Sequence, residues 1–315
     1  MKKNLTALGL TTAALFLGGL AGCGDKATAQ ATGDGALTVT TPPSAAAAPQ
    51  LDLLKGKVFP IDAYLLTPEK AKQLNAAQDL LANRCLVRYG FPASVPVSAT
   101  SLSSDDLNGR RYGVIDPAVA AQLGYHSPGG GKNAGRSPDA PQSPELTLVL
   151  YGAPDPTGKG TKAGTYKGMD VPPGGCMGEA RHKINADKFE SYDDGALAIQ
   201  LNSAAGKQAQ ADKRVVAKLG EWSACMKQQG FTYRDPFEPL DGGTLKSSLA
   251  LPAPDAQEIR TAVADVECKR KVNLIGVWYT VEVAYENALI EKNQQRLDDL
   301  KQSIDLMLKT AATVV

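Results

Sequence analysis

Histidine, a common metal ligand and general base, is scarce in this sequence. The 315 residues include only two histidines, His126 and His182. Glu179 and His182 match one half of the Glu-x-x-His pattern of carboxylate-bridged di-iron centres, but no glutamate stands at that spacing before His126. We therefore interpret both histidines as structural or solvent-exposed, and we expect no metal and no other cofactor.

Other catalytic patterns are missing as well. The chain has no Gly-x-Ser-x-Gly motif, and Gly129 to Lys132 lie in a proline-flanked loop rather than between a strand and a helix, where a phosphate cradle belongs. The acids Asp193 and Asp194, which follow Glu190, would suit a glycan hydrolase if two carboxyls lay about 5–9 Å apart. Adjacent acids beside a glycine are more typical of a solvated turn, so catalytic residues are not assigned.

An excess of charge of one sign is also lacking. The formal net charge is +1, from 34 basic and 33 acidic residues. A near-neutral chain has no electrostatic footprint for nucleic acid, so we expect no nucleic-acid partner.

The longest uncharged apolar run is at the N-terminus. It extends from Leu5 to Leu20 behind Lys2 and Lys3, which is the pattern of a secretory signal peptide and is short for a membrane-spanning helix. The sequence Leu20-Ala21-Gly22-Cys23 resembles the lipobox of bacterial lipoproteins. That resemblance implies a signal peptide over residues 1–22, cleavage before Cys23, and two acyl chains on its sulfur. The alternative is an ordinary cleaved signal with a coincidental cysteine.

Residues 23–50 and 51–315 differ sharply in composition. Behind Cys23, residues 24–50 are mostly Ala, Thr, Gly, Pro and Ser, which cannot bury enough apolar surface to offset the entropy of ordering. We predict a disordered tether over 23–50 and a folded extracytoplasmic domain over 51–315.

Helix signals dominate that domain. Thr67-Pro68 opens a helix that runs to Tyr89 and stops at Gly90, and Asp116-Pro117 opens a short helix that ends at Gly124. The segment 146–151 (LTLVLY) fits either a strand or a helix that starts at Ser143. Residues 127–144 and much of 153–175 are expected to be loops.

The last third predicts a long helix. Asp255 and Glu258 resemble a capping box, and no proline follows before Val315. An unbroken helix over 256–309 would be roughly 80 Å long. Its later apolar stripe would then need an earlier helix, a second copy or another protein as partner. That stripe consists of Leu297, Leu300, Ile304 and Met307.

Four cysteines remain after Cys23, and an even number in an exported domain indicates two disulfides with three possible pairings. Cys85 in CLVRYGF and Cys225 in CMKQQGF each stand near a helix end, whereas Cys176 and Cys268 each open or enter a later basic helix. This context suggests an internal repeat over 67–190 and 191–310, unless the matches are coincidental. The repeat predicts the pairs Cys85–Cys176 and Cys225–Cys268. The predicted fold is therefore mainly α, a disulfide-stapled bundle of two cysteine-marked helix pairs with long loops and a long C-terminal helix.

Three segments carry a resemblance to a protein family. The LAGC lipobox, CMKQQGF and the stretch ECKRK…WYTVEVAYENALIE resemble uncharacterised exported lipoproteins of high-GC actinomycete bacteria. The resemblance implies a location and a cysteine framework, and it implies no activity.

Aromatic residues supply the one candidate binding surface. Tyr233, Trp278 and Tyr279 fall near the seam between the two presumed copies, where they would line a groove for a peptide or glycan. The leading prediction is a non-catalytic binding or scaffolding module, anchored by its lipid to the outer side of the cell membrane, with cell-wall material or another envelope protein as partner. The alternatives are an envelope hydrolase that uses Asp and Glu, and the solute-binding protein of a transporter.

Overall fold

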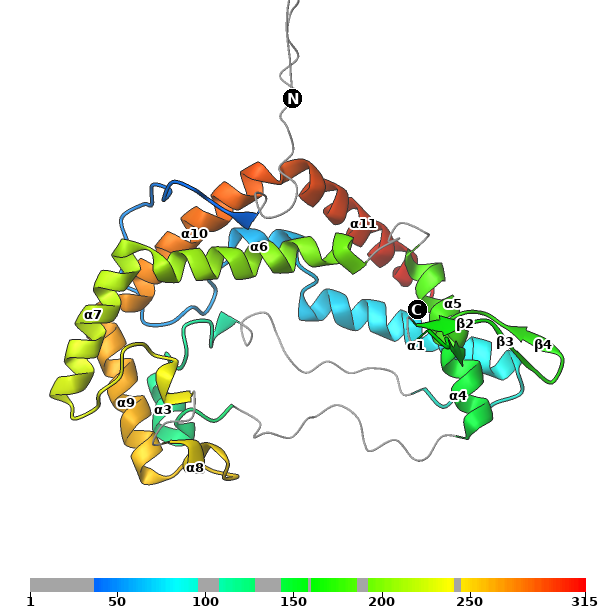
Figure 1. Cartoon of the computed structure of the whole chain (residues 1–315), viewed down its shortest axis with the longest axis horizontal. Helices are drawn as coiled ribbons and strands as arrows, with labels where there is room; N and C mark the ends of the chain where they lie inside the picture. Colours follow the sequence, from blue (N-terminus) through cyan, green and yellow to red (C-terminus); the bar gives the residue numbers. More distant parts are fainter. Residues whose placement is uncertain (1–36, 96–107, 128–142, 158–159, 186–191, 241–244) are drawn as a thin grey trace, which may run out of the picture. The chain divides into compact units, whose positions relative to one another are not determined.

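The computed structural model describes residues 37–95, 108–127, 143–157, 160–185, 192–240 and 245–315 (Figure 1). Cys23, Glu190 and the segment from Gly129 to Lys132 lie outside these residues. Helices dominate the described part, and its strands form two short antiparallel hairpins. The predicted mainly α fold is confirmed.

The elements alternate little between helix and strand, because the strands occur together between α4 and α5. In chain order they are η2 (Pro60–Tyr64), α1 (Pro68–Arg88), α3 (Pro117–Leu123), α4 (Pro144–Tyr151), β1 (Ala153–Pro154), β2 (Thr161–Lys162), β3 (Gly164–Tyr166), β4 (Met169–Val171), α5 (Gly175–Asn185), α6 (Tyr192–Ala211), α7 (Lys213–Gln228), η3 (Glu238–Leu240), α8 (Lys246–Leu249), α9 (Ala256–Lys271), α10 (Leu274–Lys292) and α11 (Gln294–Ala312). The predicted loop over 153–175 therefore contains the two hairpins.

The predicted helix starts are confirmed at three proline-led helices. The side chain of Thr67 accepts a hydrogen bond from the backbone N–H of Lys70, and Asp116 and Ser143 cap α3 and α4 in the same way. A proline at the first helical position loses no hydrogen bond, since that N–H would have no partner within the helix. The segment 146–151, which fits either type of element, is helical.

The cysteine-marked helices α1 and α7 end alike. Gly90 and Gly230 have φ values of +83° and +88°, a conformation that glycine adopts without strain. The N–H of Phe91 donates to the carbonyl of Leu86, and Phe231 donates to Met226, each at 3.0 Å. This six-to-one hydrogen bond defines the Schellman motif. The shared Gly-Phe sequence therefore has the same structural role in both places.

Both disulfides connect the cysteines as predicted. Cys85–Cys176 joins α1 to α5, and Cys225–Cys268 joins α7 to α9. Cys176 lies in the first turn of α5, as expected, but Cys268 lies in the last turn of α9 and opens no helix. The second helices of the two presumed copies thus carry their cysteines at opposite ends.

The helical run over 256–309 is not continuous, because two asparagines divide it into α9, α10 and α11 (Figure 1). Asn273 adopts the left-handed conformation (φ +53°), which asparagine tolerates better than most residues. Its side chain donates to the carbonyl of Pro49 and accepts from the N–H of Leu51. The buried Asn293 separates α10 from α11, which forms the long C-terminal helix.

The core is built mainly on the last three helices together with α6 and α7. Residues Leu297, Leu300, Ile304 and Met307 of α11 are buried, and α11 packs against α1 and α5. The second apolar stripe therefore finds its partner in earlier helices of the same chain. A separate apolar cluster surrounds the Cys85–Cys176 disulfide, where α1, α4, α5 and β4 meet.

The structure attaches the last part of the predicted tether to the domain. Residues 37–50 contain almost no regular secondary structure, yet the N–H of Val39 donates to Gln208 of α6 at 2.7 Å, and Lys292 of α10 donates to the carbonyl of Thr38. Gln50 likewise donates to the carbonyl of Arg270. These hydrogen bonds, together with the packing of Leu37 and Val39 against the main core, hold the segment although large apolar side chains are few.

Candidate functional site

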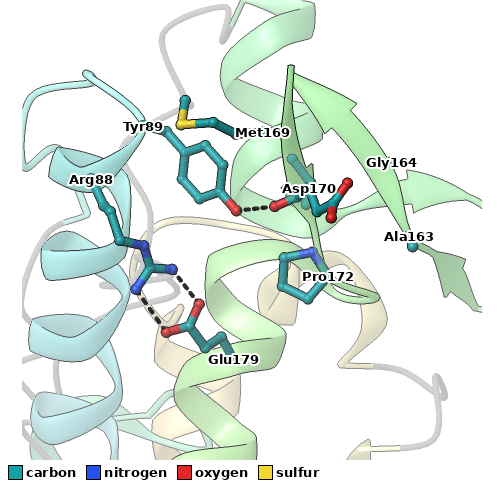
Figure 2. Close-up of a pocket in the computed structure, with 9 residues that line it drawn as sticks. Arg88, Tyr89, Ala163, Gly164, Met169, Asp170, Pro172 and Glu179 are labelled. Carbon is teal, nitrogen blue, oxygen red and sulfur yellow. Dashed lines mark hydrogen bonds and ion pairs between the residues drawn. The ribbon is translucent and has the colours of Figure 1, made fainter. Parts of the chain in front are cut away.

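A pocket of about 580 Å³ lies where the end of α1 and the start of α5 meet the β3–β4 hairpin (Figure 2). Its size falls within the range of small-ligand sites. The lining residues are Arg88, Tyr89, Ala163, Gly164, Met169, Asp170, Val171, Pro172 and Glu179. From the sequence, Tyr89 is the predicted end of a helix and Glu179 is half of a metal motif, but no pocket is predicted here.

One disulfide and one tight turn position the walls of this pocket. The Cys85–Cys176 disulfide holds the last turn of α1 within a Cα–Cα distance of 5.5 Å of the start of α5. The hairpin pairs Tyr166 with Met169 across the two-residue turn Lys167-Gly168, and φ is positive at both turn residues, as in a type I′ turn. The disulfide and the hairpin turn, both next to the pocket, therefore set the positions of its helical wall and its hairpin wall.

One wall is charged. Arg88 binds Glu179 through two hydrogen bonds, with Nη1–Oε1 and Nη2–Oε2 distances of 3.2 and 2.5 Å (Figure 2). Lys183 also donates to Glu179 at 2.7 Å. The hydrogen bond from Arg88 is the largest cause that lowers the pKa of Glu179, to about 2. Glu179 thus acts as an ion-pair partner, and the Arg88 side chain remains 53% exposed.

The rest of the pocket is mostly apolar. The hydroxyl of Tyr89 donates to the backbone carbonyl of Asp170, which ties the hairpin to α1 (Figure 2). Val171 is fully buried beneath the surface, whereas Met169 is 37% exposed. An exposed methionine beside a fixed guanidinium can bind an apolar group that carries a hydrogen-bond acceptor.

The predicted aromatic groove is not formed by its three residues. Trp278 is only 3% exposed, and its ring stacks on Tyr112 at a centroid distance of 4.8 Å. Tyr279 packs edge-on against Phe59, and its hydroxyl donates to the carbonyl of Val58. Tyr233 is partly buried against the same core. Burial of Trp278 leaves no face for a ligand, so these residues contribute to packing.

The other candidates from the sequence are placed as follows. His182 is exposed on α5, and Asp193 and Asp194 fall in the first turn of α6 rather than in a loop. Among the described residues, no group of three or more His, Cys, Asp or Glu side chains is arranged to hold a metal ion.

A buried polar network that sequence analysis missed connects Arg111 with α10. Arg111 Nη2 donates to Glu282 Oε1 at 2.7 Å and to Glu286 Oε1 at 2.9 Å. Tyr112 donates to Glu282 at 2.7 Å, and the N–H of Ile61 donates to Glu286 at 3.1 Å. Burial raises the pKa of Glu286 to about 8. The two glutamates are spaced i, i+4 on α10, but no local sequence signal connects them with Arg111.

A second internal pair lies within α9. Lys269 Nζ donates to Asp265 Oδ2 at 2.9 Å and to the carbonyl of Val114 at 2.8 Å. Asp265 also accepts from Trp222 Nε1 at 3.0 Å. Both charged side chains are almost completely buried and hydrogen-bonded inside the protein. This pair, like the Arg111 network, holds helices together and does not line the pocket beside Arg88.

Stability should depend on pH through these groups. Glu286 has a raised pKa in the folded protein, so its contribution is complete below about pH 4.5 and is lost as pH rises towards 8. The lowered pKa values of Glu179 and Asp212, both about 2, contribute stability that is lost as pH falls from about 4 to 2. We expect urea denaturation to give maximal stability near pH 5.

Replacing Glu286 by glutamine tests the alkaline side of that profile. One proton released on unfolding changes stability by at most about 1.4 kcal/mol per pH unit. Glu286→Gln cannot ionise, so it should flatten the decline between pH 5 and 8. An equally steep decline in the variant would show that other groups cause the dependence.

No helix in the described part of the chain is both long and apolar enough to cross a membrane. No protein-family model, curated protein or solved structure matches this chain.

Proposed function

We propose that this protein is a lipid-anchored, extracytoplasmic binding module of the cell envelope, without catalytic activity. Two disulfides with sulfurs buried among helices support an oxidising compartment, because such bonds are rare in the reducing cytosol. The lipobox-like sequence before Cys23 supports anchoring through acyl chains, and two chains suffice for stable membrane attachment.

The pocket beside Arg88 is the observation that carries the binding function. Its apolar surface suits one aliphatic or aromatic side chain, and the exposed edge of the Arg88 guanidinium suits a carbonyl or carboxylate beside that side chain. A peptide presents this combination at every apolar residue. The ligand is therefore a peptide segment, either from another exported protein or from the peptide part of the cell wall.

The arrangement of charged groups supports a non-catalytic role. Arg111 with its glutamates and Asp265 with Lys269 are buried and paired with one another. The pocket itself pairs its main carboxylate, Glu179, with two cations. A solute-binding protein of two lobes rich in parallel strands finds no support, since the strands of the described residues form two antiparallel hairpins.

Site-specific photo-crosslinking in living cells tests the pocket. A photoreactive residue in place of Met169 should give a discrete adduct, and Arg88→Ala should reduce its yield at least several-fold. The matched control is Ile199 on α6, which is 60% exposed and remote from the pocket lining. Sensitivity of the adduct to protease or to a muramidase distinguishes an exported protein from wall peptide. Equal adducts from both positions, or none from position 169, would exclude this pocket as the binding surface.

The anchor is tested by mass spectrometry of the mature N-terminus. We expect a diacylglyceryl group on Cys23 and loss of residues 1–22, and Cys23→Ala should release the protein from the membrane fraction. An unmodified thiol at Cys23 would contradict the anchor while leaving the pocket unaffected.

A further inference from the structure

His126 directs both ring nitrogens at hydrogen-bond acceptors. Nδ1 lies 2.8 Å from Glu258 Oε1, and Nε2 lies 2.9 Å from the carbonyl oxygen of Leu251. A neutral imidazole has one N–H and can donate only one of these bonds, whereas the imidazolium donates both. The geometry therefore matches protonated His126.

Groups from several elements face this histidine. Glu258 at the start of α9 is fully buried and also accepts from the N–H of Tyr125 and from the hydroxyl of Ser248. Arg110 donates to the carbonyl oxygens of Tyr125 and His126. The hydrogen bond to Leu251, followed by Glu258, raises the pKa of His126, and the positive charge of Arg110 opposes this rise.

The backbone at Gly124 permits the close contact between His126 and Glu258. A Cβ atom at Gly124 would lie 2.6 Å from Glu258 Oε1, and the residue has a φ of +54°. A glycine is thus required where the turn after α3 passes over the carboxylate. This turn brings Tyr125 and His126 onto Glu258 without displacing it.

The hydrogen bond to Leu251 holds the segment 249–254, which begins at the last residue of α8 and leads into α9. Ser248 holds the same region without a charge on histidine, because it donates to Glu258 and accepts from the N–H of Asp255. Beneath lies a small apolar cluster of Val114, Ala120, Tyr125, Leu245, Ala262 and Val266. The segment therefore has one attachment that depends on protonation and one that does not.

We propose that His126 is a pH-sensitive latch that fastens segment 249–254 when protonated and releases it when neutral. On deprotonation the remaining proton stays at Nδ1, because a carboxylate accepts a stronger hydrogen bond than a carbonyl does. The lone pair of Nε2 then faces the carbonyl oxygen of Leu251, and this contact is repulsive. The segment moves away from the ring, while Ser248 keeps its end attached.

NMR titration of the full chain tests the latch. His182→Gln on exposed α5 leaves His126 as the single histidine, so its ring signals are unambiguous. We expect a midpoint above the ordinary value of about 6.5. Backbone amide signals of residues 249–255 should shift with the same midpoint. Amides that do not follow the ring, or a ring that remains neutral down to pH 6, would overturn the proposal.

Two variants distinguish release of the segment by His126 from a general loss of structure in the segment. His126→Gln combined with His182→Gln should hold the amides of 249–255 at their alkaline positions at every pH. Ser248→Ala removes the other attachment and should retain the pH-dependent shift. If His126→Gln does not fold, the titration of the His182→Gln protein still tests the proposal, since that substitution leaves His126 and its partners unchanged. Equal pH dependence of these amides with glutamine at position 126 would refute the latch.

Discussion

Arg111→Ala is expected to lower the free energy of unfolding by about 3–5 kcal/mol, as in other buried ion pairs that lose one partner. Arg111 is the cation paired with Glu282 and Glu286, whose side chains are 2% and 0% exposed. Its removal takes the cation and its hydrogen bonds away from the buried carboxyl groups of Glu282 and Glu286, and Asn202 also loses its hydrogen bond from the guanidinium. The guanidinium also packs over the ring of Phe59 at 3.9 Å. Urea denaturation at pH 7 measures the loss.

The matched control is Arg234→Ala. Arg234 also pairs with a glutamate, Glu238, but its side chain is 87% exposed, so the change should cost far less stability than Arg111→Ala. Adding Glu282→Gln to Arg111→Met should recover part of the lost stability, because one buried charge disappears with the cation. A loss below about 1 kcal/mol for Arg111→Ala would contradict a structural role for the network.

Replacing both Cys85 and Cys176 by alanine should cost about 2–5 kcal/mol. This disulfide spans 91 residues, and in the chain-entropy model it restricts the unfolded chain correspondingly. It also stands at the centre of the small apolar cluster of α1, α4, α5 and β4, and it joins the two helices whose ends line the pocket. The double variant should therefore lose the pocket before the rest of the domain unfolds.

Urea denaturation and photo-crosslinking from position 169 check the two parts of this expectation. The comparison variant replaces Cys225 and Cys268, whose disulfide closes 43 residues within the main core. Its cost should differ by less than about 1 kcal/mol, because loop entropy depends on the logarithm of length. It should retain the pocket. Loss of the crosslink in both variants alike would mean that the pocket depends on global stability and not on its own disulfide.

Features that depend on neighbouring residues could be predicted from the sequence. The caps at Thr67, Asp116 and Ser143 and the glycine ends of α1 and α7 are local, since each is decided by backbone conformation and hydrogen bonds within a few residues. The cysteine pairing followed from similar sequence around Cys85 and Cys225.

Features that depend on contacts between distant residues could not be predicted. Asn273 ends α9 because Pro49 and Leu51 use its amide, and Trp278 is buried because Tyr112 and Phe237 cover it. No local sequence pattern predicts these contacts.

The sequence by itself determined the mainly helical class, the starts of several helices, the disulfide framework and the absence of familiar catalytic motifs. Tertiary structure alone decided the division of the last helical third, the Arg111 network, the contact of His126 with Glu258 and the pocket beside Arg88. The reason is physical: propensity and capping act over one or two turns, whereas burial and charge pairing depend on which distant side chains meet.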